Sequence, residues 1–257
     1  PMMRTYTNMT WPDDPYRTGQ QLYRRPVPRL AAFTTGCTAK GNRLVPSAVA
    51  IVYLPLHRTQ AVSVTEQTLT FGFRAASTDD PADLPALAAL ADFDLMQARR
   101  HAAVLAGHRL VSDLAALQQP GDAVALRGLA AVEREWAARG KVAGRAATFD
   151  CGLDLPGAPS LELACQEAGI DAGPGADGAD GREAVMLAVK RALMIALICA
   201  RHQGRYNWAG LLRTGPVLAA VTWDCLPQPI LDIVGLTSQA VTQSGIRVGA
   251  ALPGNLK

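Results

Sequence analysis

His108 and Asp113 lie five positions apart in the stretch GHRLVSDLAAL, residues 107–117. An imidazole and a carboxylate at the junction between a strand and a helix can hold a metal ion or exchange protons in an active site. The same stretch also suits a polar loop that enters a helix, because Ser112 or Asp113 could cap a helix that begins at Leu114. The spacing leaves both interpretations open, and the surrounding elements must separate them.

Composition and charge narrow the class of protein without identifying a partner. The chain of 257 residues is 49% hydrophobic and 18% charged, which is typical of a globular protein. Its formal net charge of +3 is weak for a dedicated nucleic-acid binder, but it does not exclude such a role. The most apolar run, residues 184–200, is interrupted by Lys190 and Arg191, so we predict a buried helix there and no membrane partner.

Cysteine and histidine usage argues against a zinc site. The cysteines are dispersed, without the CxxC spacing of zinc ligands, and the chain has four histidines. An odd, dispersed set is typical of reduced thiols, so we predict a cytoplasmic protein with no bound metal. The cysteines are Cys37, Cys151, Cys165, Cys199 and Cys225.

Strands come first along the chain, and helices alternate with strands after them. Apolar or alternating runs predict strands over residues 29–36, 47–56 and 61–74, and their short connections favour an antiparallel meander. Strands followed by alternating helices and strands predict an α/β layer fold. We predict helices ending at Gly107 and starting at Asp113, a strand or turn at 108–112, helices over 125–140, 159–170 (capped by Ser160) and 182–203, and a strand over 145–153.

The organisation predicted from these elements has three parts. Residues 1–28 are expected to form an irregular arm, residues 29–208 the main domain, and residues 209–257 a C-terminal extension packed on that domain. Within the extension we predict a strand over 215–224, a helix over 229–245 and a last strand over 246–252.

Four segments in this order carry a resemblance to a known family. They are RLAAFTTG, AGHRLVSDLAAL, ATFDCGLDLPGAPSLELACQEAGI and KRALMIALICA, which together span roughly residues 29–203. In order and spacing the chain resembles the DEDDh-type 3'-to-5' exonucleases of the ribonuclease H-like superfamily. The resemblance implies a mixed sheet, an antiparallel meander followed by parallel strands, flanked by helices.

The same resemblance implies that the catalytic positions are degenerate. The first acidic pair of the family falls on Thr34 and Gly36, the second acid on Asp113, the general base on Lys190 and the final acid on Ile195. The family's reaction uses two divalent cations held by carboxylates. With one acid of four present, we expect no catalytic residue, no metal and no cofactor, and therefore a protein that is not an enzyme.

Two further hypotheses concern the charges around Asp113. Lys190 could replace the missing cation by pairing with Asp113 in the former cleft, or it could extend from a core helix to solvent. Glu66 or Asp150 could instead join Asp113 in a relocated Mg²⁺ or Mn²⁺ site, which would make the protein an active exonuclease. We expect a structural role for His108, because the family's base does not fall at its position.

Basic and aromatic residues are the candidates for contact with a partner. Such residues can bind phosphates and stack bases, but they also suit a helix C-terminus followed by an aromatic cover of the core. We predict a pseudo-exonuclease that binds single-stranded nucleic acid or a protein partner, with a scaffold or homo-oligomer subunit as the alternative. The candidate nucleic-acid-binding residues are Arg109, Arg201, Arg205, Tyr206 and Trp208.

Overall fold

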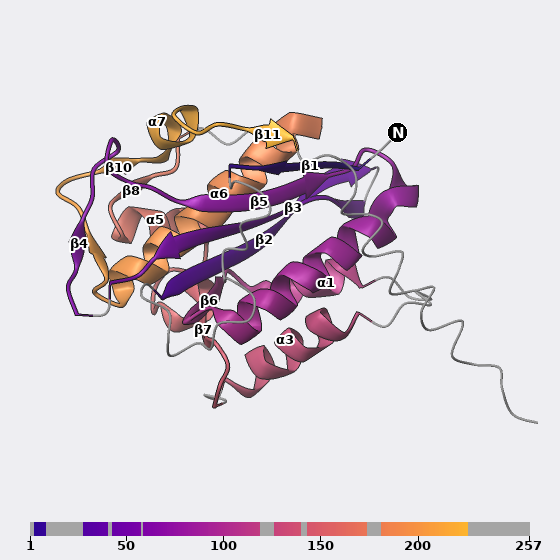
Figure 1. The fold of residues 1–257 in the computed structure, drawn as a ribbon, viewed down its shortest axis with the longest axis horizontal. Coiled ribbons are helices and arrows are strands. Elements are labelled where there is room, and N and C mark those ends of the chain that lie inside the picture. Colours follow the sequence, from indigo (N-terminus) through magenta and orange to yellow (C-terminus); the bar gives the residue numbers. More distant parts are fainter. Residues whose placement is uncertain are drawn as a thin grey trace, which may run out of the picture. The chain divides into compact units, whose positions relative to one another are not determined.

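A mixed sheet forms the centre of the computed structural model (Figure 1). The structure describes residues 3–8, 28–40, 43–57, 59–118, 126–139, 143–173 and 181–225. The strand order is β11-β1-β5-β3-β2-β6-β7, in which β5, β3 and β2 are antiparallel and β6 and β7 are parallel to β2. The five central strands are β2 (Arg29–Lys40), β3 (Arg43–Pro55), β5 (Gly72–Ser77), β6 (Val104–Gly107) and β7 (Ala147–Asp150).

The antiparallel meander predicted from the sequence is confirmed, with one change. β2 and β3 are longer than the apolar runs that predicted them and pair along their whole length. The run at 61–74 divides into β4 (Val62–Ser63) and the start of β5. β4 leaves the central sheet and pairs in parallel with β9 (Tyr206–Asn207). Only β5 of these two therefore completes the meander.

One central strand was predicted as the end of a helix. In the structure α1 (Leu84–His101) ends at His101. Residues 104–107 form β6, which pairs with β2 on one side and with β7 on the other. All of β6 is buried, so it has no polar alternation. A short apolar run of this kind cannot be distinguished from a buried helix by periodicity, and the prediction that the helix reaches Gly107 is wrong for that reason.

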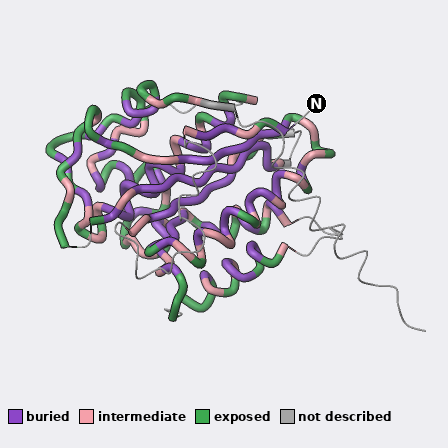
Figure 2. Tube along the Cα trace, viewed as in Figure 1, coloured by how far each residue is buried: buried purple, intermediate pink, exposed green. Residues whose placement is uncertain are grey.

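Helices cover both faces of the sheet (Figures 1 and 2). α6 (Gly181–His202) packs on β2, β3 and β5, and Leu30 and Ala32 share its hydrophobic cluster. The alternate residues Ala31 and Phe33 are also buried, and they point to the opposite face of the sheet because side chains alternate along a strand. No helix among the described residues is long and apolar enough to cross a membrane. The remaining helices are η2 (Pro81–Asp83), α2 (Leu110–Leu117), α3 (Arg127–Ala138), α4 (Cys151–Asp154), α5 (Leu161–Glu167) and α7 (Thr214–Ala219).

The segments predicted as an N-terminal arm and as a C-terminal extension packed on the domain both contain regular structure. The supposed arm begins with β1 (Arg4–Thr7), which pairs with β5 inside the sheet. The supposed extension contains α7 where a strand was predicted, and Val217 and Leu218 of α7 join the hydrophobic cluster of α6. β1, the five central strands, α6 and α7 therefore belong to one compact unit. The helix predicted at 229–245 and the strand at 246–252 lie outside the described residues.

Two features that the sequence predicted after residue 140 are present in the structure, one of them shortened. Ser160 caps α5 as predicted by accepting a hydrogen bond from Leu163 N at 3.3 Å. The strand predicted at 145–153 stops at Asp150, and the chain turns directly into α4. The remaining short strands are β8 (Ile170–Asp171), β10 (Leu212–Arg213) and β11 (Asp224–Cys225).

Gly128 allows α3 to approach α1 closely, and its replacement is expected to be costly. A Cβ on Gly128 would lie 2.3 Å from the backbone oxygen of Asp92. We expect Gly128→Ala to lower the free energy of unfolding by about 1–3 kcal/mol, because a helix must shift to relieve the clash. Chemical denaturation would measure this. Gly215→Ala in α7 is the control, since a Cβ there meets nothing within 4 Å, and it is expected to leave stability unchanged or raise it.

Candidate functional site

Asp113 is hydrogen-bonded to β2, one of the five central strands of the sheet. Its Oδ2 atom accepts hydrogen bonds from the Thr34 hydroxyl at 3.1 Å and from the Thr35 backbone N–H at 2.9 Å. Asp113 lies in the first turn of α2, and both threonines lie in β2. Two positions implied by the exonuclease resemblance, Thr34 and Asp113, are therefore in direct contact.

Charge and burial act on Asp113 in opposite directions. Burial raises the pKa of the Asp113 carboxyl above its ordinary value, while the hydrogen bonds from Thr35 and Thr34 and the positive charge of Arg191 lower it. Burial is the largest of these effects, so the carboxyl is easier to protonate than an exposed aspartate.

The cation beside Asp113 is Arg191. The predicted ion pair between Asp113 and Lys190 is not among the ion pairs found in the described part of the chain. Lys190 Nζ lies instead near Gly173, the second residue after β8: a Cβ built on Gly173 would be 3.6 Å from it. The prediction failed because neighbouring residues of a helix point about 100° apart, so only one of the two can face β2.

The Asp113 carboxyl predicts a specific dependence of stability on pH. Its pKa is raised in the folded state, so its contribution to stability is complete below the unfolded pKa and is lost as the pH rises through the folded pKa. Asn keeps an acceptor for Thr34 and Thr35 without the charge. We expect Asp113→Asn to raise the unfolding free energy at neutral pH by on the order of 1 kcal/mol and to flatten this pH dependence.

Denaturant unfolding across the acidic and neutral range would measure the effect. Ser112→Ala, an exposed neighbour on α2, is the matched control and should leave the pH profile unchanged. A loss of stability in Asp113→Asn at neutral pH would show that the negative charge itself is required.

Asp150, the last residue of β7, holds the turn that leads from β6 into α2 through hydrogen bonds. Its two carboxylate oxygens accept bonds from four N–H groups: Arg109 N (2.8 Å), Gly152 N (2.9 Å), Leu110 N (3.2 Å) and Trp136 Nε1 (2.7 Å). Because α2 begins at Leu110, its first amides are capped by a carboxylate from another strand, and the predicted caps Ser112 and Asp113 are not used. The stretch that contains His108 and Asp113 is therefore a polar turn into a helix, and hydrogen bonds to Asp150 at the end of β7 hold it in place.

The turn holds Arg109 in a strained conformation. Its φ of 51° lies in the left-handed region, which non-glycine residues rarely adopt. Gly152 makes room for the turn, because a Cβ there would lie 2.9 Å from Arg109 Cγ and 3.4 Å from His108 Nε2. Strain of this kind persists only where surrounding bonds impose it, and those of Asp150 do so here.

His108 lies among charges rather than in a purely structural position. Burial is the main cause that lowers the pKa of its imidazole; Asp150 and Asp113 raise it, and Arg191 and Arg109 lower it. Its Nε2 atom is buried and has no hydrogen-bond partner within the described chain. Where the sequence suggested a structural role, the structure places His108 in the polar group around Asp113.

Three side chains that interact electrostatically within the polar group around Asp113 and His108 were not predicted: Arg191, Cys37 and Glu162. Arg191 acts on Asp113, on His108, and on the side chains of Cys37 and Glu162. Cys37 is exposed at the surface, but partial desolvation and the nearby Asp113 raise the pKa of its thiol, so the thiol stays protonated at neutral pH. The sequence signal for Arg191 was its place beside Lys190, but only helix packing shows which of the two faces the group.

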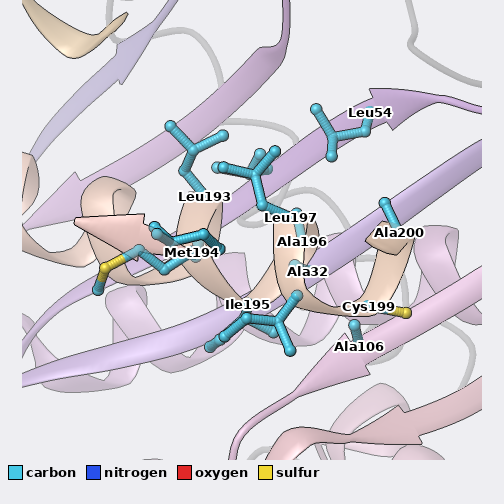
Figure 3. Packing of buried hydrophobic residues seen from close by; sticks show 14 of the residues in the cluster. Ala32, Leu54, Ala106, Leu193, Met194, Ile195, Ala196, Leu197, Cys199 and Ala200 are labelled. Carbon is cyan, nitrogen blue, oxygen red and sulfur yellow. The ribbon is translucent and has the colours of Figure 1, made fainter. Parts of the chain in front are cut away.

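The other positions implied by the resemblance are packing positions. Ile195 was expected at the cleft, but it is 1% exposed and lies in the hydrophobic core with Leu197 and Cys199 (Figure 3). Gly36 lies where β2 packs against β3, since a Cβ there would be 3.3 Å from Ala48 Cβ, tighter than most real contacts.

The acids proposed as relocated metal ligands have other partners. Both oxygens of Glu66 bind the Arg213 guanidinium, at 2.6 and 2.9 Å, and the two oxygens of Asp150 receive the four N–H groups described above. No group of three or more His, Cys, Asp or Glu residues within the described ranges is arranged to hold a metal ion. Because Thr34 and Gly36 supply no carboxylate, the residues present do not fit the metal pair that the family implies.

The aromatic candidates for base stacking are buried. Tyr206 donates its hydroxyl hydrogen to Pro55 O at 2.7 Å, and Trp208 donates its indole N–H to Gly169 O at 2.9 Å. Arg201 stacks on the Trp208 ring at 4.5 Å and binds Ala168 O. This geometry matches the alternative of an aromatic cover over the core, and it leaves little ring surface for a base.

Arg109 and Arg205 lie in different parts of the molecule. Arg109 follows β6 and belongs to the group around Asp113, whereas Arg205 follows α6 and donates to His57 O at 3.4 Å. The end of α6 at His202 is about 17 Å along the helix axis from Arg191, at ~1.5 Å per residue. Comparison of the chain with protein families, with curated proteins and with solved structures finds no match.

Proposed function

We propose that the protein is a catalytically inactive, exonuclease-like domain of the ribonuclease H-like type that binds nucleic acid. The strand order β5-β3-β2-β6-β7, antiparallel across the first three strands and parallel across the last three, supports this fold assignment. It is the arrangement that the resemblance implies, with Asp113 bound to the first strand of the meander.

The hydrogen bonds and charges around Asp113 are the main support for the proposed absence of catalysis. A two-cation reaction needs several carboxylates that converge on the metal ions. Here Asp113 meets two threonine donors and the charge of Arg191. The positive charge of Arg191 acts on the carboxyl, and such a charge opposes the binding of a divalent cation.

Nuclease and binding assays on the same preparation test the proposal. Labelled single strands of DNA and RNA are incubated with the protein in Mg²⁺, in Mn²⁺ and in chelator. We expect no shortening in any condition, and binding at low salt that weakens as salt is added. Trimming that chelator abolishes and that Asp113→Ala lacks would show an active exonuclease instead. Absence of binding at low salt would leave a protein partner or self-association as the function, which solution mass would examine.

A further inference from the structure

Four arginines lie at the end of the sheet opposite Asp113. We call this set the basic end: Arg29, Arg100, Arg145 and Arg205. Arg29 is the first residue of β2, and Thr34 is about 16 Å further along that strand, at ~3.3 Å per residue. The basic end is therefore separate from the polar group around Asp113.

Backbone contacts place these arginines in a row, one beside each of four neighbouring strands. Arg29 O accepts a bond from Ala103 N (2.8 Å), just before β6, and Ala146 N, just before β7, donates to Arg99 O (2.9 Å) at the end of α1. Arg145 precedes Ala146, and Arg100 follows Arg99. On the other side Leu56 N donates to Pro28 O (2.7 Å), and Arg205 binds the next carbonyl, that of His57.

The four arginine side chains of the basic end are exposed or half-buried. Arg100 and Arg145 are exposed, and Arg29 and Arg205 are half-buried. The neighbouring Arg99 is committed to Glu135, with which it forms an ion pair at 2.5 Å. Cations at the end of a helix are also favoured by the helix dipole, which applies here to the end of α1.

The spacing of the row fits a phosphate backbone. Neighbouring strands are about 4.8 Å apart, so β3, β2, β6 and β7 span roughly 14 Å. Over that length a stacked, helical nucleic-acid strand presents roughly four phosphates, because its rise along the helix axis is ~3.4 Å per residue. Arginine suits such contacts because its planar guanidinium binds phosphate oxygens in pairs. With Tyr206 and Trp208 buried, recognition would use the backbone rather than stacked bases.

We infer that the basic end binds the phosphate backbone of a nucleic-acid strand, and that the polar group around Asp113 does not contribute to this binding. The inference rests on the proposed function, because it assigns a surface to the nucleic-acid binding proposed there. It differs from the expectation that Arg109 and Arg205 act together, since these residues lie at opposite ends of the sheet.

The salt dependence of binding tests the assignment. For a labelled single strand bound by the wild-type chain, four phosphate contacts predict a slope of log K against log salt of about −3. Arg100→Ala/Arg145→Ala is expected to reduce the magnitude of this slope by about 1.4 and to weaken binding at low salt. Arg100→Lys/Arg145→Lys keeps the charges and should retain the slope. Arg109→Ala removes a positive charge at the other end of the sheet and should bind as the wild type does.

The outcomes separate this inference from the proposed function. Binding that is lost in Arg109→Ala and retained in Arg100→Ala/Arg145→Ala would overturn the inference and leave nucleic-acid binding intact. No binding by the wild-type chain would overturn both. Displacement of the strand by polyglutamate at equal charge concentration would show a general acidic partner and overturn the assignment to phosphate. Thermal unfolding of each variant verifies folding, which these arginines are not expected to affect.

Discussion

Replacing Arg74 by Met is expected to lower the free energy of unfolding by about 3–5 kcal/mol, because it leaves a buried carboxylate without its cation. Arg74 in β5 and Asp94 in α1 form an ion pair at 2.6 Å, with side chains that are 5% and 6% exposed. The guanidinium also lies 5.9 Å from the Phe93 ring centroid. This pair joins the sheet to α1 in an otherwise apolar layer.

The pH dependence of the Arg74→Met variant provides a second measurement. Burial raises the pKa of Asp94, and Arg74 opposes that effect. Without Arg74 the folded pKa rises further, so the variant keeps stability in acid and loses it as the pH rises through that pKa. Denaturant unfolding in mildly acidic and in neutral buffer should therefore show a larger deficit at neutral pH.

A double variant distinguishes the ion pair from simple packing. Arg74→Met/Asp94→Leu removes both charges, and we expect it to be markedly more stable than Arg74→Met alone, because no unpaired charge remains. A double variant as unstable as the single one would show that the loss comes from packing around Arg74 and not from an uncompensated Asp94.

Replacing Asp150 by Ala is expected to lower the unfolding free energy by at least about 3 kcal/mol, since each buried donor left without an acceptor costs ~1–3 kcal/mol. Asp150 is 2% exposed and satisfies four N–H groups from three different segments. Thermal or denaturant unfolding would measure the loss. The turn that carries His108 and Arg109 should also become mobile, which amide hydrogen exchange at Arg109 and Leu110 would report.

Two variants control the Asp150 experiment. Asp150→Asn keeps the shape of the side chain but turns an NH₂ group toward N–H donors, so it should also be destabilised, which separates lost hydrogen bonding from an empty cavity. Asp80→Ala removes a carboxylate that caps η2 by accepting from Ala82 N at 2.9 Å, and it should cost only about 0.5–2 kcal/mol. Equal losses in Asp150→Ala and Asp80→Ala would contradict the central role of Asp150.

The alternation and helical periodicity of the chain were sufficient for much of the fold. Apolar runs predicted strands over 29–36 and 47–56 and a helix over 182–203, and the structure contains β2, β3 and α6 at these places. β1 and β6 were not predicted, since each has four residues and neither alternates in a way that separates a strand from its alternatives. Their pairing partners lie far away in the sequence, and only the assembled sheet stabilises them.

The sequence by itself determined that Asp113 is the one acid at the four acidic positions that the exonuclease resemblance implies, because that follows from residue identity alone. Tertiary structure decided which groups surround it. Thr34 and Thr35 donate hydrogen bonds to Asp113 from β2, and the charge of Arg191 rather than that of Lys190 acts on its carboxyl, because these interactions depend on how α2 and α6 pack on the sheet. Packing also buried Tyr206 and Trp208 and separated Arg109 from Arg205, since contacts between distant segments leave no periodic trace in the chain.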